Sequence, residues 1–165
     1  MTAGFLATNG LIRFDTAAET FTHYLPNPND PRSLATGATR MIHFDRSGVL
    51  WLGTEGGGLH KFNDADGTFT RYGLEQGVPL NVLSILEDDS GNLWLGTSEG
   101  LCRFNPQAGR VDKQYRAADG LQGDAFQALA AVKTRDGRLW FGGTNGLNSF
   151  HPDQLATNLH KPPVV

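Results

Sequence analysis

Short apolar runs alternate with polar turn residues along this chain. The apolar run at 82–86 (Val-Leu-Ser-Ile-Leu) ends in an Asp/Ser/Gly turn, and a second run, Leu-Trp-Leu-Gly at 93–96, follows at once. Runs of this length bounded by turn residues are typical of β-strands. The glycines of the turns supply the positive φ that a tight hairpin needs. The pattern predicts short antiparallel strands joined by tight turns.

Three segments repeat one pattern of turn, strand, loop and strand, at residues 47–62, 90–104 and 136–150. A truncated copy runs over 4–14, with Gly4 at the tryptophan position. The tryptophans at 51, 94 and 140 are 43 and 46 residues apart. A period of about 40–50 residues built from short strands predicts the blades of a β-propeller. Glycines after the tryptophans are expected where neighbouring backbones approach closely.

Each repeat is interpreted as four strands, and the fourth has aromatic-x-x-aromatic spacing, as at 21–24 and 69–72. The second strands are apolar nearly throughout, which predicts sheets buried on both faces. We expect about 14 strands, or roughly three and a half blades. The predicted all-β segment covers 1–158, with a partial blade at 4–35, whole blades at 36–78 and 79–123, and a last blade at 124–151. Residues 159–165 are expected to be an exit linker.

Propellers generally close with 4 to 8 blades, so an arc of this size would expose an apolar blade face at each end. This predicts either further blades outside this sequence or closure by self-association. The first is favoured.

The same residues resemble the two-component regulator propeller repeats of bacterial sensor proteins. The matching pattern is an apolar strand, then acidic-Asp-x-x-Gly-x-Leu-Trp-x-Gly-Thr, then Gly-Leu-x-x-Phe; residues 85–104 meet it almost fully and residues 42–62 closely. The stretch at 29–34 resembles the family's connection between blades, and the C-terminal stretch from Phe141 resembles its final blade and exit. Gly143, in place of the usual Thr, departs from the pattern. The resemblance implies a periplasmic sensing propeller that leads into a sandwich domain, a membrane helix and an output module such as a histidine kinase.

Composition and charge exclude several classes of protein. The net charge of −3 is spread along the 165 residues, so no basic stripe for nucleic acid is present. No apolar stretch approaches the roughly 20 residues of a membrane span, and no direct membrane contact is expected. The start of the chain lacks the features of a signal peptide. Cys102 stands alone, so a disulfide within the chain is excluded.

The sequence contains no recognisable catalytic or metal-binding motif, and no cofactor is expected. The tryptophans are assigned to core packing rather than to sugar stacking. The acidic stretches 64–67 and 88–92 could offer oxygens to calcium, but their place in the repeat favours turn chemistry. The five histidines lack metal spacing and are interpreted as scattered surface or strand residues. Cys102 is interpreted as a small packed thiol.

A ligand site on a propeller is expected where loops converge around the central axis. The loops entering each first strand and those between second and third strands are the candidates for that face. Their polar residues could bond sugar hydroxyls; they are Arg40, Glu55, Asn81, Glu99, Asp124 and Asn145.

Three alternative functions are compatible with the sequence. The first is a non-catalytic sensor module that binds an oligosaccharide, by family resemblance, or another small ligand. The second is a scaffold for protein–protein interaction that closes its ring by oligomerising. The third and weakest is a propeller lyase or glycosidase, which would need acidic pairs or a His/Tyr/Arg set at the axis.

Overall fold

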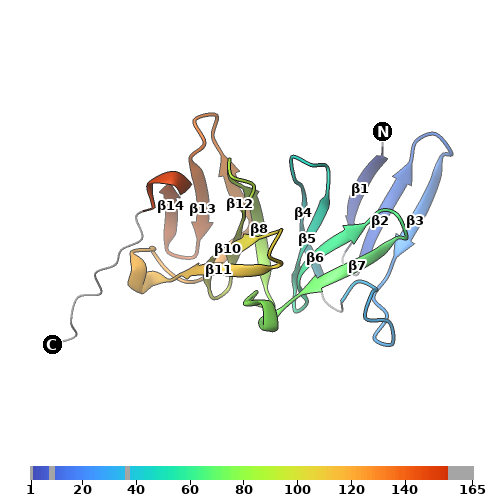
Figure 1. Cartoon of the computed structure of the whole chain (residues 1–165), viewed down its shortest axis with the longest axis horizontal. Coiled ribbons are helices and arrows are strands. Elements are labelled where there is room, and N and C mark those ends of the chain that lie inside the picture. The colour runs from blue at the N-terminus through green and yellow to red at the C-terminus, as the bar shows by residue number, and fades with distance from the viewer. Residues whose placement is uncertain (1, 8–9, 36–37, 156–165) are drawn as a thin grey trace.

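The computed structural model describes residues 10–35 and 38–155 and the backbone of residues 2–7. This part of the chain holds fourteen strands in four antiparallel sheets, which follow one another along the molecule in chain order (Figure 1). Within each sheet the strands pair in sequence order, so every sheet is a simple meander. The predicted all-β fold of propeller blades is confirmed.

The four sheets are defined by the following strands. The first contains β1 (Thr2–Ala7), β2 (Gly10–Asp15) and β3 (Thr20–Tyr24), and the second contains β4 (Ala38–Phe44), β5 (Leu50–Glu55), β6 (Gly58–Asn63) and β7 (Thr68–Tyr72). The third contains β8 (Val82–Glu87), β9 (Leu93–Thr97), β10 (Gly100–Asn105) and β11 (Arg110–Tyr115), and the fourth β12 (Phe126–Lys133), β13 (Leu139–Gly143) and β14 (Gly146–Phe150). Short 3-10 turns are η1 (Leu74–Gln76), η2 (Ala117–Asp119) and η3 (Pro152–Gln154).

In the second and third blades, an aspartate of the turn holds the tryptophan of the strand that follows. Asp88 accepts hydrogen bonds from the backbone N–H groups of Ser90 and Asn92 at 2.9 Å through one carboxylate oxygen. Its other oxygen accepts the indole N–H of Trp94 at 2.9 Å. Asp45 accepts the Trp51 indole N–H at the same distance. Asp88 therefore serves the turn, as expected, and it also orients the buried ring.

The last three blades are held together by aromatic packing between the tryptophan of one blade and the third strand of the next. The ring of Trp51 in β5 lies 5.7 Å from Phe104 in β10, and that of Trp94 in β9 lies 4.8 Å from Phe150 in β14. Trp51 and Trp94 are almost fully buried. The assignment of these two rings to the core is confirmed.

Gly53, two residues after Trp51, lies where the third blade comes close to the second. A Cβ atom on Gly53 would lie 2.7 Å from the backbone oxygen of Val82, which is nearer than such atoms approach one another. Larger residues at this position would push β5 away from β8. The expected close approach of neighbouring backbones is confirmed here.

Polar side chains tie the blades together at the ends of the sheets where the first strands lead into the second. Arg46 of the second blade pairs with Glu87 of the third at 2.7 Å, and Lys133 of the fourth pairs with Asp89 of the third at 2.7 Å. The first strands of the last three blades also contact one another, since β8 contacts both β4 and β12 and β12 contacts β4. These strands therefore form the common inner edge of the arc.

The two end blades each carry a face that no neighbour covers. In the last blade Leu129, Val132 and Leu147 are 64%, 57% and 60% exposed, and in the first blade Phe21 is 60% exposed. Inside the arc the corresponding faces form continuous apolar cores. The expected exposed apolar face is confirmed for the last blade, and the described strands of the first blade contribute exposed Phe21.

Two single residues test the expectations for titratable groups. Cys102 is a buried free thiol, as predicted. His60 lies in strand β6, in agreement with the interpretation of the histidines as surface or strand residues, and its side chain is fully buried. The exit linker at 159–165 falls outside the described residues.

Candidate functional site

The expected ligand-binding loops lie together at one end of the sheets. The β5–β6 and β9–β10 hairpins turn at this end, and the segments that enter β4, β8 and β12 begin there. Because the first strands form the inner edge of the arc, their entry loops are the ones closest to its centre. We refer to this end as the axial loop face.

Three of the six expected site residues are joined by direct contacts. Arg40 on β4 pairs with Glu55 at the end of β5, with Nε to carboxylate at 2.7 Å. Glu55 also bridges to Asn81 through the backbone. The Asn81 side chain accepts the Gly56 N–H at 2.9 Å and donates to Ser98 at 3.2 Å. These contacts make a continuous polar row from the second blade to the third.

The other three expected residues lie in separate surroundings on the same face. Glu99 follows Ser98 in the β9–β10 hairpin, and its backbone oxygen accepts the Gln114 amide at 2.9 Å. Asp124 accepts the backbone N–H of Ala117 at 2.6 Å, which ties the entry of β12 to η2. A Cβ atom on Gly123 would lie 3.1 Å from the amide nitrogen of Asn145.

Sequence reasoning missed Gln122 and Asn148, which lie beside these loops in the last blade. The backbone N–H of Gln122 donates to Asn148 at 3.0 Å. Among the described residues, both polar atoms of the Gln122 side chain and the Asn148 amide nitrogen are buried without a hydrogen-bond partner. Buried amides in this state favour a ligand or water that completes their bonding. Asn148 occupies the variable third-strand position that Ile12, His60 and Cys102 hold in the other repeats. The polar amide at this position was therefore a signal in the sequence that could have identified Asn148 as a candidate site residue.

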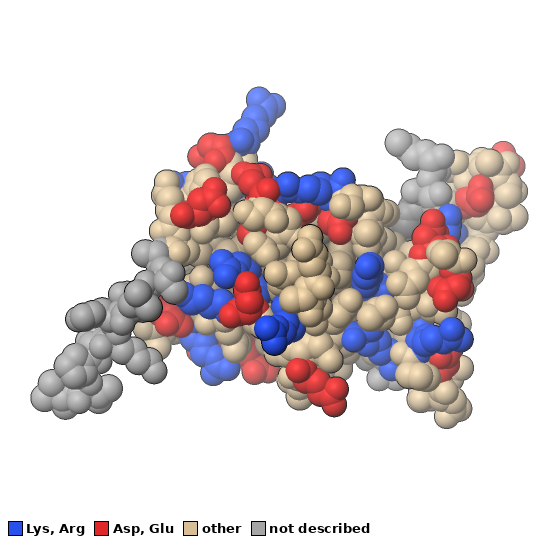
Figure 2. Space-filling view, in the orientation of Figure 1, with Lys and Arg blue, Asp and Glu red and all other residues tan. Residues whose placement is uncertain are grey.

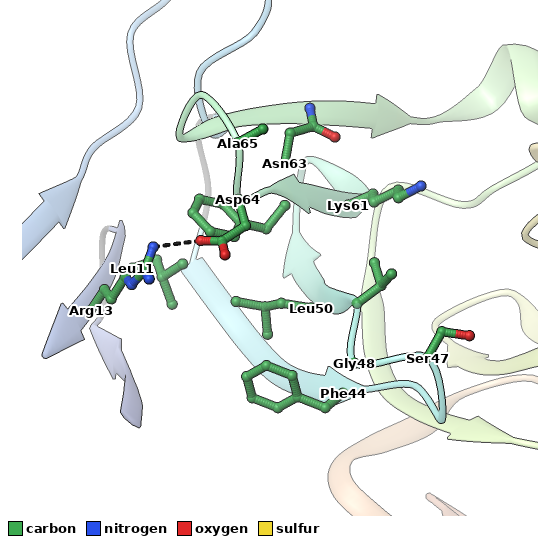
Figure 3. A pocket seen from close by; sticks show the side chains of 12 residues that line it. Leu11, Arg13, Phe44, Ser47, Gly48, Leu50, Lys61, Asn63, Asp64 and Ala65 are labelled. Atoms are coloured by element: carbon green, nitrogen blue, oxygen red, sulfur yellow. Dashed lines mark hydrogen bonds and ion pairs between the residues drawn. The ribbon is translucent and has the colours of Figure 1, made fainter. Parts of the chain in front are cut away.

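The opposite end of the first two blades holds a pocket of about 440 Å³ (Figure 3). Its apolar lining includes Leu11 of β2 together with Leu50 and Phe62 of the second blade. Arg13 on β2 reaches across to Asp64 in the β6–β7 turn, with 2.5 Å between the guanidinium and the carboxylate (Figure 3). The pocket is therefore apolar inside, with one ion pair at its side.

Burial and pairing set the titration of several groups. Desolvation, with a smaller effect of the Arg71 charge, lowers the pKa of His60 to about 4, so its ring is neutral at pH 7. The ring nitrogen Nε2 then accepts the Ala35 N–H at 3.2 Å. Desolvation raises the pKa of Cys102 to about 12, which keeps the thiol protonated and unreactive. The hydrogen bond and charge of Lys133 lower the pKa of Asp89.

Charges of both signs are interspersed over the face shown in Figure 2. Within the described ranges, no group of three or more His, Cys, Asp or Glu side chains could hold a metal ion. No helix in the same part of the chain is long and apolar enough to cross a membrane.

Comparison with known sequences and structures agrees with this architecture. Residues 77–99 match the sequence profile of the two-component regulator propeller family. No curated protein sequence matches the chain.

Two of the similar solved structures show the extracellular domain of BT4673 from B. thetaiotaomicron. One structure describes BT4673 as a one-component system, and the other describes it as a hybrid two-component system. The TM-scores are 0.76 and 0.70, with 23% and 18% identity, over 92% and 90% of this chain. A protein described as a gluconolactonase matches over 88% of this chain and 46% of its own, with a TM-score of 0.56 and 16% identity.

The chain spans about a fifth of the length of the BT4673 domain, 22% and 20% in the two structures. At these sequence identities the structural similarity shows only that the chain has the propeller fold. The sequence match at residues 77–99 shows in addition which type of propeller repeat is present there. The strands and turn of residues 77–99 recur, with the same tryptophan position, in the second and fourth blades. Residues 77–99 thus match a two-component regulator propeller repeat, and the chain as a whole has the fold of β-propeller blades.

Proposed function

We propose that this chain is part of the ligand-sensing propeller of a bacterial signal-transduction protein, exposed in the periplasm and acting without catalysis. The observation that carries the proposal is the regulator-propeller repeat at residues 77–99, seated in a row of like blades. The likeness to extracellular domains of sensor proteins supports the location.

The axial loop face is the proposed ligand site. Arg40, Glu55 and Asn81 form its polar row, and the unpaired amides of Gln122 and Asn148 lie on the same face. Carboxylate, guanidinium and amide groups together donate to and accept from hydroxyl groups, which suits an oligosaccharide. Ligand binding would then favour one arrangement of the blades, and the attached output module would respond to that shift.

Two experiments test the proposal. Sequencing the native gene on both sides should find more Leu-Trp-x-Gly blades before residue 1, and a sandwich domain, a membrane helix and an output module after residue 165. An open reading frame bounded at Met1 and Val165 would contradict the sensor assignment and favour a scaffold that closes by oligomerising.

A thermal-shift panel of neutral and acidic oligosaccharides tests the site itself. At least one glycan should raise the melting temperature, and Asn81→Ala should weaken that effect because its amide links two blades of the face. Asn105→Ala, at the opposite end of the third blade, is the matched control and should leave the glycan effect unchanged. Turnover of any glycan would overturn the non-catalytic part of the proposal.

A further inference from the structure

The interface between the second and third blades contains three aromatic rings in mutual contact. In the interface of the second and third blades, Trp51 lies 5.9 Å from Tyr72 and 5.7 Å from Phe104, and those two rings meet edge to face at 5.0 Å and 70°. The indole is the middle element of the group and is almost completely buried.

The interface of the first and second blades preserves two of these rings without the third. Tyr24 and Phe62 take the places of Tyr72 and Phe104, and they meet at 5.0 Å and 73°. Gly4 takes the place of the tryptophan, because it pairs with Arg13 across β1 and β2 as Trp51 pairs with Lys61 across β5 and β6. The pocket of about 440 Å³ lies beside Phe62, in this same interface.

A cation also occupies its expected position relative to the absent ring. In the second blade the Lys61 ammonium lies 6.0 Å from the centre of the Trp51 ring. Arg13 holds the equivalent position in the first blade, lines the pocket and is fixed by Asp64 of the next blade (Figure 3). A planar guanidinium held in this way can lie over an aromatic face.

We propose that this pocket binds a small planar aromatic ligand of about the size and shape of an indole. The walls and the cation are those that surround an indole elsewhere in the same chain, and the volume is within the range of about 300–1,000 Å³ usual for small-molecule sites. An apolar cavity left by a missing side chain binds aromatic molecules of matching shape. Asp64 at the pocket wall can accept a hydrogen bond from a ring N–H.

This site is separate from the axial loop face. The pocket is lined by residues of the β4–β5 and β6–β7 turns, such as Gly48 and Ala65, whereas the axial loops lie at the other end of the same sheets. Binding in the pocket therefore does not depend on the proposed sensing of oligosaccharides, and either one can fail without the other.

The test uses 3-methylindole, which is the tryptophan side chain as a free molecule, and the whole 165-residue chain. Calorimetric titration should show one saturable site per chain. The methyl resonances of Leu11 and Leu50, which line the pocket, should shift in NMR spectra. Those of Leu101, in the filled interface around Trp94, should not. Absence of saturable binding by the folded chain would overturn the proposal.

Two variants and a matched control locate the site. Gly4→Trp restores the missing ring and should abolish saturable binding. Arg13→Ala should weaken binding roughly 2–5-fold through loss of the cation over the ring. Arg103→Ala removes the equivalent cation of the third blade, where Trp94 already fills the space, and should leave the affinity unchanged. Undiminished binding by a folded Gly4→Trp variant would contradict the proposal. If that variant does not fold, equal affinities of Arg13→Ala and Arg103→Ala would do the same.

Discussion

At the scale of single residues, the blades depend on a few buried polar groups that have little freedom to change protonation state. His60 is the clearest case, because its ring is enclosed between the first two blades and one nitrogen accepts the Ala35 N–H. The other nitrogen, Nδ1, has no partner among the described residues. A proton added to this ring would place an unpaired charge in the core, beside the Arg71 charge.

This environment predicts a loss of stability in weak acid. His60 takes up a proton near pH 6.5 in the unfolded chain, but its pKa in the folded chain is about 4. Between these values only the unfolded state is protonated, so the free energy of unfolding falls as the pH is lowered from 6.5 to 4. The full loss is about 3 kcal/mol. Desolvation lowers the pKa of His43 too, which adds to the loss in the same direction.

Urea unfolding at a series of pH values measures the effect. His60→Gln keeps a hydrogen-bond acceptor but cannot be protonated, so most of the slope between pH 6.5 and 4 should disappear. His23→Gln, at an exposed position of β3, should leave the slope unchanged. A wild-type slope retained in His60→Gln would show that other groups are responsible.

At the scale of elements, the connection between the first and second blades is ordered by one side chain from a strand. Arg71 of β7 donates to the backbone oxygen of Ser33 at 2.8 Å, to that of Asp30 at 3.0 Å and to that of Leu34 at 3.2 Å. It also donates to the Ser33 hydroxyl at 3.0 Å. Leu34 is thereby kept in the core beneath the loop. The described part of this connection, residues 25–35, is thus fixed to the blade that follows it.

Removing this anchor should loosen the connection and destabilise the chain. Arg71→Leu leaves several carbonyl groups without their donor, and the cost is about 2–3 kcal/mol for the charged hydrogen bonds. Arg71→Lys should recover only part of it, because an ammonium cannot reproduce the planar fork. Hydrogen exchange should show faster exchange over residues 27–34. Arg110→Leu, exposed on β11, is the control and should change neither stability nor exchange there.

At the scale of the whole molecule, the described blades form an arc, and each end blade has one face that no neighbouring blade covers. Phe14 in the first blade holds the third-strand position from which Phe104 and Phe150 pack on the tryptophan of the preceding blade. Phe14 instead stacks on Phe21 at 4.6 Å. Trp140, at the other end, is the tryptophan without a following blade. One end face therefore presents the phenylalanine, and the other the tryptophan, of the pair that packs together inside the arc.

This complementarity predicts head-to-tail association of the isolated chain. Sedimentation velocity should show the average mass rising with concentration, because contact between the two faces buries exposed leucine and phenylalanine. Leu129→Lys with Leu147→Lys should shift the equilibrium towards monomer. Leu74→Lys, which changes an equally exposed leucine on η1, should not. A strictly monomeric wild-type chain at high micromolar concentration would contradict the prediction.

Local patterns in the sequence were sufficient to predict the blades of this protein. Tryptophans one blade apart, Asp/Ser/Gly turns and apolar second strands are local signals, and each acts through hydrogen bonds or packing within one repeat or its neighbour. The role of Asp88 in its turn, the burial of Trp51 and Trp94 and the close approach at Gly53 were therefore predictable. The candidate loops could be located for the same reason, since a repeat fixes which end of its sheet each loop occupies.

The roles of the variable positions, by contrast, depend on how the blades pack against one another. Ile12, His60, Cys102 and Asn148 share one place in the repeat, yet His60 and Cys102 are fully buried and Asn148 holds an unpaired amide. In the sequence, Gly4 marks only a degenerate copy of the repeat. The pocket beside Phe62 that accompanies the missing tryptophan forms only where the first and second blades meet. The physical reason is that a repeat specifies its own backbone, whereas burial, pKa and cavity volume depend on which side chains the neighbouring blade brings to the interface.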